Sequence, residues 1–341
     1  MQDNTTTDRL AVLDGWRGLS MLGLLTCHLL PVGPKVWGMN EVVGMSVMTI
    51  LFSLSGFLIT ANLLRNDDVR VFYVRRVCRI LPLAYPFLAV VLLVYGKDLE
   101  TFAAYFLFQI NYRPEFITEL TSPLWSLCVE MHFYLFIGLL VAVFGRRGLY
   151  ALPFIGLVLT VLRIAGGNRV SLQTHLRADE ILAGAAAALV HFSPAFSRLR
   201  RYVATPHPLI WMALLMFCCH DSTNNNWAYL RPYPAACVIA CTLWREGAGS
   251  PILLSRVLRY VGDISYSLYV LHPILRVGWL GSGSKLELYL FKRPLGFLML
   301  LAVAHLSTFY YEHRWIAWSK KWFRRPRVAP VAAPVVSTTA S

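Results

Sequence analysis

Residues 41–64 read EVVGMSVMTILFSLSGFLITANLL, and Glu41 is the one charged residue in the stretch. A transmembrane helix needs about 20 mostly apolar residues, so this stretch is long enough to cross a bilayer. The whole chain has the same character, with 57% hydrophobic residues, 15% charged residues and a mean hydropathy of +0.54. A soluble domain has about 25% charged residues. We therefore predict that lipid is the solvent of much of this protein.

Similar apolar stretches recur along the 341 residues of the chain. The fold class that we predict is all-α, a polytopic membrane protein with about ten transmembrane helices and both termini in the cytoplasm. The expected spans are residues 11–32, 41–64, 80–96, 123–144, 149–166, 178–192, 207–220, 232–245, 261–280 and 288–312.

Basic residues fall in clusters between the apolar stretches. The net charge is +14, from 32 Lys and Arg against 18 Asp and Glu. Cytoplasmic loops of membrane proteins are rich in Lys and Arg, and ten spans with both ends inside put every basic cluster in the cytoplasm. These clusters lie at 65–79, 145–148, 197–201, 245–259 and 314–327. No nucleic-acid-binding motif is present, so we predict membrane lipid as a partner and no nucleic acid.

The chain is expected to divide into three parts. Residues 1–10 form a cytoplasmic segment, 11–316 the membrane domain, and 317–341 a basic and then disordered cytoplasmic tail, since Pro, Ala, Ser and Thr dominate its end. The apolar stretch TFAAYFLFQINY at 101–112 is too short for a span. Counting it as one would place the later basic loops on the outer side of the membrane. We interpret it as a half-span or an interfacial helix.

Cysteine and histidine spacing predicts no metal site. The seven cysteines form no CxxC pair, and the nine histidines form no HExxH pattern. We expect the cysteines to behave as small buried hydrophobic residues.

Ionisable residues inside the expected spans are the informative ones, because a charge in hydrocarbon is costly to bury. Arg17 and His28 lie eleven positions apart in the first span. On a helix this is about 16 Å along the axis and close to three turns, so both side chains project from nearly the same face. His28 is therefore either a group of an active site or a histidine satisfied within the bundle.

Glu130 lies inside the fourth expected span, in WSLCVEMHFYLF at 125–136. An unpaired carboxylate there costs several kcal/mol, about 2–7 for a polar group without a partner and more for a charge, so it should face a cavity or a cation. The segment ISYSLYVLHP at 264–273 places hydroxyl groups and His272 on one helix. These groups suit substrate contacts and helix-to-helix hydrogen bonds equally well.

Two further segments each allow a structural and a functional interpretation. FSLSGFLIT at 52–60 contains Ser53, Ser55 and Gly56, which suit close helix packing or close approach of the backbone to a ligand. FYVRRVCRILP at 72–82 is dense in arginine. It could contact lipid headgroups, or bind phosphate groups through its guanidinium forks.

Together these segments resemble, in order, the motifs of membrane-bound acyltransferase family 3. In that family an LDGxRG motif opens the first span, and its Arg is separated from a His by ten residues. The chain departs where Glu130-Met131-His132 stands in place of Glu-Glu-Gln, and where Leu271 stands in place of a Trp. The matching segments are LDGWRG at 13–18 with Arg17 and His28, FSLSGFLI at 52–59, RRVCRILP at 75–82, WSLCVEMHFY at 125–134, SYSLYVLHP at 265–273 and YYE at 310–312.

The resemblance implies transfer of an acyl group, usually acetyl from acetyl-CoA, to a hydroxyl of a carbohydrate at the bacterial inner membrane. No cofactor is expected to be bound permanently, since acyl-CoA is a substrate. Some relatives carry a further hydrolase-like domain, and we expect this chain to end before one. The oligomeric state stays open and could be a homodimer. The implied residues are His28, Glu130 and Arg17 for catalysis, Arg75, Arg76, Arg79 and Ser55 for the donor, and Trp125, Tyr134, Tyr266, Tyr269 and His272 for substrate.

Two alternatives remain at this point. A transporter or flippase of a lipid-linked glycan would also carry charged residues inside a helical bundle, although the chain lacks the two related halves common in transporters. The resemblance also implies a macrolide-type antibiotic as an alternative acceptor.

Overall fold

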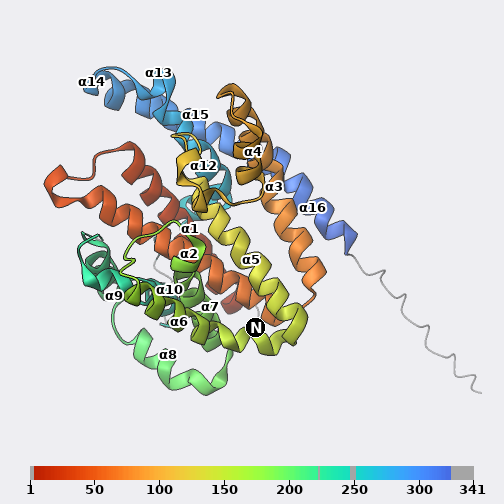
Figure 1. Ribbon diagram of the computed structural model, residues 1–341. Coiled ribbons are helices and arrows are strands. Elements are labelled where there is room, and N and C mark those ends of the chain that lie inside the picture. The colour runs from red at the N-terminus through yellow and green to blue at the C-terminus, as the bar shows by residue number, and fades with distance from the viewer. Residues whose placement is uncertain (1–3, 222, 246–250, 324–341) are drawn as a thin grey trace, which may run out of the picture.

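The computed structural model describes residues 4–221, 223–245 and 251–323, and side chains from residue 11 onward. Helices and their connections make up the whole of this described part, so the all-α prediction is confirmed (Figure 1). The α-helices are α1 Asn4–Leu29, α2 Met39–Arg65, α3 Val69–Val94, α4 Leu99–Phe106, α5 Leu124–Phe144, α6 Leu152–Ala165, α7 Asp179–Phe192, α8 Ser197–Ala204, α9 Pro208–Cys219, α10 Pro232–Trp244, α11 Arg256–Asp263, α12 Ser265–Leu271, α13 Gly278–Gly281, α14 Lys285–Glu287, α15 Arg293–Leu306 and α16 His313–Trp322.

Four helical segments of the described chain are long and apolar enough to cross a membrane. They are Met39–Arg65, Val69–Val94, Leu124–Ala165 and Lys285–Trp322, and a fifth is counted if α7 and the following helical segment, bent by 99°, form one span. The expected number of about ten spans stays a prediction, as does the cytoplasmic location of the termini. Helices α9 and α10, with 12 and 13 residues, are shorter than the 20 or so that a span needs.

The segment 101–112 forms no long helix. Helix α4 ends at Phe106, and single turns of 3₁₀ helix follow at Ile110–Tyr112 and Pro114–Phe116. Eight residues rise about 12 Å, which is less than half of the hydrocarbon thickness. The predicted half-span or interfacial helix agrees with this length.

Helices α1 and α2 stand between the hydrophobic clusters of the fold. One cluster joins α2 and α7 to α3 and α5, a second joins α1 and α2 to α9 and α10, and a third joins α1 to α12 and α15. Figure 1 shows α8 at one end of the bundle and α13 with α14 at the other. The arrangement leaves α1 and α2 in the interior, where their polar residues face neighbouring helices.

Glycines of the LDGWRG motif let α1 lie directly against the segment 253–262. A Cβ on Gly15 would stand 2.0 Å from the carbonyl oxygen of Leu253, and one on Gly18 would stand 2.0 Å from that of Leu258. From the other side, a Cβ on Gly262 would lie 2.4 Å from the carbonyl oxygen of Asp14. No side chain fits at these three positions, so backbone contacts fix where Arg17 projects.

Helices α2 and α7 approach each other in the same way. A Cβ on Gly56 would meet the carbonyl oxygen of Ile181 at 1.8 Å, and one on Gly184 would meet that of Ser53 at 1.8 Å. The Ser53 hydroxyl also donates a hydrogen bond to the backbone carbonyl of Glu180 at 3.0 Å. In the segment 52–60, Gly56 and Ser53 thus serve helix packing.

Helix α3 contains Pro82 and Pro86, and tyrosines satisfy the carbonyls beside them. Because Pro86 has no N–H, the carbonyl of Pro82, four residues earlier, lacks its helical donor. The hydroxyl of Tyr311 donates to this carbonyl at 2.9 Å, and that of Tyr266 donates to the carbonyl of Ile80 at 2.6 Å. These two phenols thus add hydrogen bonds beside the prolines of α3, which runs as one continuous helix from Val69 to Val94.

We predict that Gly56→Ala destabilises the protein, because its methyl group would force α2 and α7 apart. The free energy of unfolding is expected to fall by about 3 kcal/mol, the cost of a badly overpacked core. The Tm of the purified variant measures this. Gly44→Ala, on the same helix, is the control, since its Cβ would meet only the Sγ of Cys27 at 3.3 Å. Equal losses in the two variants would contradict the prediction.

Candidate active site

A small cavity lies between α1, α2, α3, α5 and α12 and collects most of the predicted site residues. Its volume is about 120 Å³. A water molecule occupies about 30 Å³ in the liquid, so the cavity has room for a few waters or a small acyl group. Its polar lining residues are Arg17, Ser55, Arg76, Arg79, Ser126, Glu130, Tyr134, Ser265, Tyr266 and Tyr269.

Glu130 is fixed at this cavity by two hydroxyl groups. Ser55 of α2 donates to its Oε1 at 2.6 Å, and Tyr134, one turn further along α5, donates to its Oε2 at 3.0 Å. Both hydrogen bonds come from residues expected at the site, and they orient the carboxylate. Neither of them comes from His28, whose ring contacts His272 instead.

Three arginines surround this single carboxylate in the cavity wall. The guanidinium of Arg76 lies 5.6 Å from the ring centre of Tyr134 and 5.7 Å from that of Phe72. Arg17 has an acidic neighbour outside the wall, since its Nη1 lies 3.7 Å from Asp14. Even with Asp14 counted beside Glu130, the guanidinium groups of Arg17, Arg76 and Arg79 leave the cavity positive, which suits an anionic ligand.

His28 pairs with His272 instead of with a carboxylate. The Nδ1 of His28 lies 3.0 Å from the Nε2 of His272, whose own Nδ1 lies 2.8 Å from the carbonyl oxygen of Tyr269. A carbonyl only accepts, so His272 carries its proton on Nδ1, and its Nε2 accepts from His28 when neutral. His28 then carries its proton on Nδ1 and presents a free lone pair on Nε2, as a base or nucleophile requires.

Tyr269 separates the histidine pair from the cavity. Its phenol lines the cavity, where it lies 2.5 Å from the Ser126 hydroxyl and also donates to the carbonyl of Pro123, while its backbone holds His272. On α1, Arg17 and Met21 contribute to the cavity wall. His28, two turns beyond Met21, is exposed and lies outside this wall.

The remaining predicted residues lie around the cavity rather than in its wall. Arg75 is exposed and points away from it, unlike Arg76 and Arg79. The ring of Trp125 packs edge-on against Phe52, a wall residue, with a centroid distance of 6.0 Å. Within the described ranges no group of three His, Cys, Asp or Glu could hold a metal, and the absence of a metal stays a prediction.

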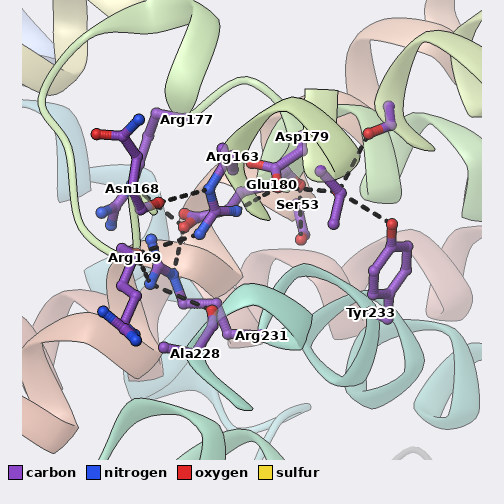
Figure 2. A network of polar contacts seen from close by, with 12 residues as sticks. Ser53, Arg163, Asn168, Arg169, Arg177, Asp179, Glu180, Ala228, Arg231 and Tyr233 are labelled. Carbon is purple, nitrogen blue, oxygen red and sulfur yellow. Dashed lines mark hydrogen bonds and ion pairs between the residues drawn. The ribbon is translucent and has the colours of Figure 1, made fainter. Parts of the chain in front are cut away.

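The bundle also contains a buried network of charged side chains that the sequence did not predict. Arg163 forms an ion pair with Asp179, and Glu180 contacts Arg231 at 2.7 Å and Arg177 at 3.2 Å. All five side chains are almost completely buried. Figure 2 shows the two carboxylates facing arginines that come from separate parts of the chain.

This network contacts aromatic residues in and behind the cavity wall. The guanidinium of Arg177 lies 5.3 Å from the ring centre of Trp125 and 5.9 Å from that of Phe52. A signal for the network exists in the sequence, since Arg163 lies within an expected span and Asp179 begins the next. The cost of burying charge marks these residues as firmly as it marks Arg17 and Glu130.

Another buried carboxylate, that of Glu312, accepts hydrogen bonds from hydroxyl groups. Ser267 of α12 and Ser307, at 2.9 Å, both donate to its Oε1. The π-helical turn Ser307–Glu312 carries this residue and the neighbouring Tyr311. In the YYE motif, Glu312 thus contacts α12 and Tyr311 contacts α3.

A comparison with protein families matches residues 10–313 to the family described as "Acyltransferase domain". The chain belongs to this acyltransferase family. The match covers most of the chain, and it confirms the resemblance to membrane-bound acyltransferase family 3 that the motifs indicated. The cavity and the histidine pair both lie inside the matched region.

Relatives of this acyltransferase chain occur in bacteria. It is 29% identical to "Putative peptidoglycan O-acetyltransferase YrhL" of Bacillus subtilis (strain 168), over 77% of this chain and 48% of that protein. It is 25% identical to "O-acetyltransferase OatA" of Staphylococcus aureus (strain NCTC 8325 / PS 47), over 77% of this chain and 50% of that protein. The chain thus spans about half the length of these relatives. No solved structure gives a significant match.

We predict that Asp179→Asn destabilises the acyltransferase, because it leaves the buried guanidinium of Arg163 without its counter-charge. Removing one partner of a buried pair costs about 3–5 kcal/mol of unfolding free energy, measured as a lower Tm. The control is Asp67→Asn, since Asp67 lies on the surface and Arg146 lowers its pKa through a hydrogen bond. This control should melt close to wild type; an Asp179→Asn protein that does the same would exclude a stabilising role for the pair.

Proposed function

We propose that this chain is an integral membrane O-acyltransferase that moves an acyl group, acetyl in the simplest case, from acyl-CoA to a hydroxyl of a carbohydrate. The observation that carries the proposal is the arrangement of its two polar centres. A positive cavity and a histidine with a free ring nitrogen lie on either side of one residue, Tyr269. Family membership and the printed names of the relatives agree with O-acyl transfer.

The donor side of the proposal rests on the arginines of the cavity. Acyl-CoA carries phosphate groups, and guanidinium forks match phosphate oxygens in charge and geometry. Arg76 and Arg79 lie one turn apart on α3 and both line the cavity. With its phosphates held there, the small acyl end enters the cavity toward Ser55 and Glu130. Arg75 faces away and is assigned no role in this step.

The transfer step uses the free ring nitrogen of His28. The Nε2 takes the proton of the acceptor hydroxyl while the hydroxyl oxygen attacks the thioester carbonyl carbon. The C–O bond of the ester forms, the C–S bond breaks, and the CoA thiolate leaves and is protonated. In the alternative route His28 first accepts the acyl group itself and then passes it to the hydroxyl. Either route requires the acyl group to pass Met21 and Tyr269.

The acceptor that we propose is a carbohydrate of the cell surface or of an exported glycan. One relative is named for peptidoglycan, which supports a polysaccharide acceptor. The apolar helices and the bacterial relatives support a location in the bacterial inner membrane. A macrolide hydroxyl is the other acceptor to assay, since its chemistry in the transfer step is the same.

We predict that His28→Ala lowers the rate of acyl transfer by about 10²- to 10⁴-fold, the usual contribution of a general base. Membranes containing the variant are assayed with labelled acetyl-CoA and a polysaccharide acceptor, and acetyl-CoA affinity should be unchanged. Mass spectrometry of wild-type protein incubated with donor alone separates the two routes, because only the carrier route leaves an acyl group on His28. A folded, fully active His28→Ala protein would refute the assignment.

We predict that Arg76→Ala and Arg79→Ala each weaken acyl-CoA binding by about tenfold or more, because each removes hydrogen bonds to a charged phosphate. Binding to purified protein, measured by isothermal calorimetry, gives the Kd. Arg75→Ala is the matched control on the same helix and should change the Kd less than about twofold, as exposed charges do. If the control loses as much affinity as the other two variants, the cavity is not the donor site.

A further inference from the structure

An apolar groove lies between α6, α7, α8 and α10, on helices that do not line the candidate active site. Its volume is about 390 Å³. Small side chains of α7 and α10, such as Ala186 and Ala240, form its floor, and exposed leucines of α6 and α8, Leu157 and Leu199, stand at its rim. Apart from Asp179, which is paired with Arg163, and Tyr233, the lining is apolar or aromatic and suits a hydrocarbon chain.

A basic pocket of about 800 Å³ adjoins this groove at α8. Arg200, Arg201 and Arg245 line it, and its described lining contains no Asp or Glu. Trp244 lines both the groove and the pocket, so the two meet at its side chain. Trp is the residue enriched where membrane hydrocarbon meets water, which fits this boundary.

Helix α8 has the features of a helix that lies on a membrane surface. The helical segment containing it is bent by 99° from α7, so it runs across the bundle instead of along it. Leu199 and Val203 face the groove, while Arg200 and Arg201 face the basic pocket. Such a division of apolar and basic residues is typical of interfacial helices, and three arginines within four residues would be costly in hydrocarbon.

We propose that the groove and the basic pocket form one binding site for an anionic phospholipid. A hydrocarbon chain of the lipid fills the groove, and the phosphate contacts Arg200, Arg201 and Arg245. The Nη1 of Arg200 donates hydrogen bonds to the carbonyls of Val190 and His191, and the Nη1 of Arg245 donates one to the carbonyl of Thr205. A guanidinium has five N–H donors, so both arginines keep donors for a phosphate. The site stands whether or not the proposed acyl transfer is correct.

The test is lipid titration of delipidated, full-length protein followed by native mass spectrometry. Wild-type protein is expected to retain one phosphatidylglycerol and to bind it at least about tenfold more tightly than phosphatidylcholine of the same chain length. Both lipids carry a phosphate, but the choline cation of phosphatidylcholine would be repelled by the three arginines of the pocket. Arg201→Gln combined with Arg245→Gln should remove this preference. Ala186→Phe, which fills the groove, should abolish retention of the lipid.

Two variants control for general effects of charge and bulk. Arg198→Gln removes an exposed arginine of α8 that lines neither space, and Val158→Phe adds a ring to the exposed face of α6 outside the groove. Both should bind phosphatidylglycerol as wild type does, and the Tm of every variant checks folding.

Three results would each overturn the proposal. One is equal binding of the two lipids, which would indicate ordinary annular lipid. Another is unchanged binding in the Ala186→Phe and double-arginine variants, provided that they are folded. The last is full competition by glycerol 3-phosphate, since a headgroup without a chain would then occupy the pocket by itself. Selective binding that both variants reduce and both controls keep supports a joint site.

Discussion

Direct contact between helix backbones, at positions where no side chain fits, is the constraint from which the rest of this structure follows. Gly56 and Gly184 bring α2 against α7, and Gly15, Gly18 and Gly262 bring α1 against the segment before α12. In a bilayer, helices gain little from the hydrophobic effect on meeting each other, so close packing has to hold them. Ser55 and Arg17 reach the same cavity because their helices are fixed in this way.

The sequence indicated which polar residues turn into the bundle, but not which partners they meet, and the catalytic and binding roles of these residues stay predictions. Arg17, Ser55, Arg76, Arg79, Glu130 and Tyr134 do line one cavity, because an ionisable group in an apolar helix needs a polar place to face. The pairing of His28 with His272 lay beyond prediction, since it joins residues 244 positions apart through the fold. Helix periodicity gives the face on which a residue lies, but not which neighbour that face meets.

Two kinds of buried charge coexist in this bundle, and they have opposite consequences. In the buried network, Asp179 contacts Arg163 and Glu180 contacts Arg231. These charges neutralise each other and hold the helices together. In the cavity, three guanidinium groups face Glu130, which hydroxyl groups already bind, and Arg17 also contacts Asp14 outside the wall. The remaining excess of positive charge suits an anionic ligand. Sequence position does not distinguish the two cases, because Arg17 of the cavity and Arg163 of the network each lie in an apolar stretch.

Helix α3, which contains two prolines, receives one of its hydrogen bonds from a residue that lies far along the chain. Tyr311, which completes the hydrogen bonding at Pro82, follows it by 229 positions. Until the segment that carries Tyr311 has folded against α3, the donor that Pro86 cannot supply to this carbonyl has no replacement from the phenol. Helix α3 can therefore complete its hydrogen bonding only after that distant segment has been inserted, so the folding of the arginine-bearing helix is coupled to a segment far along the chain.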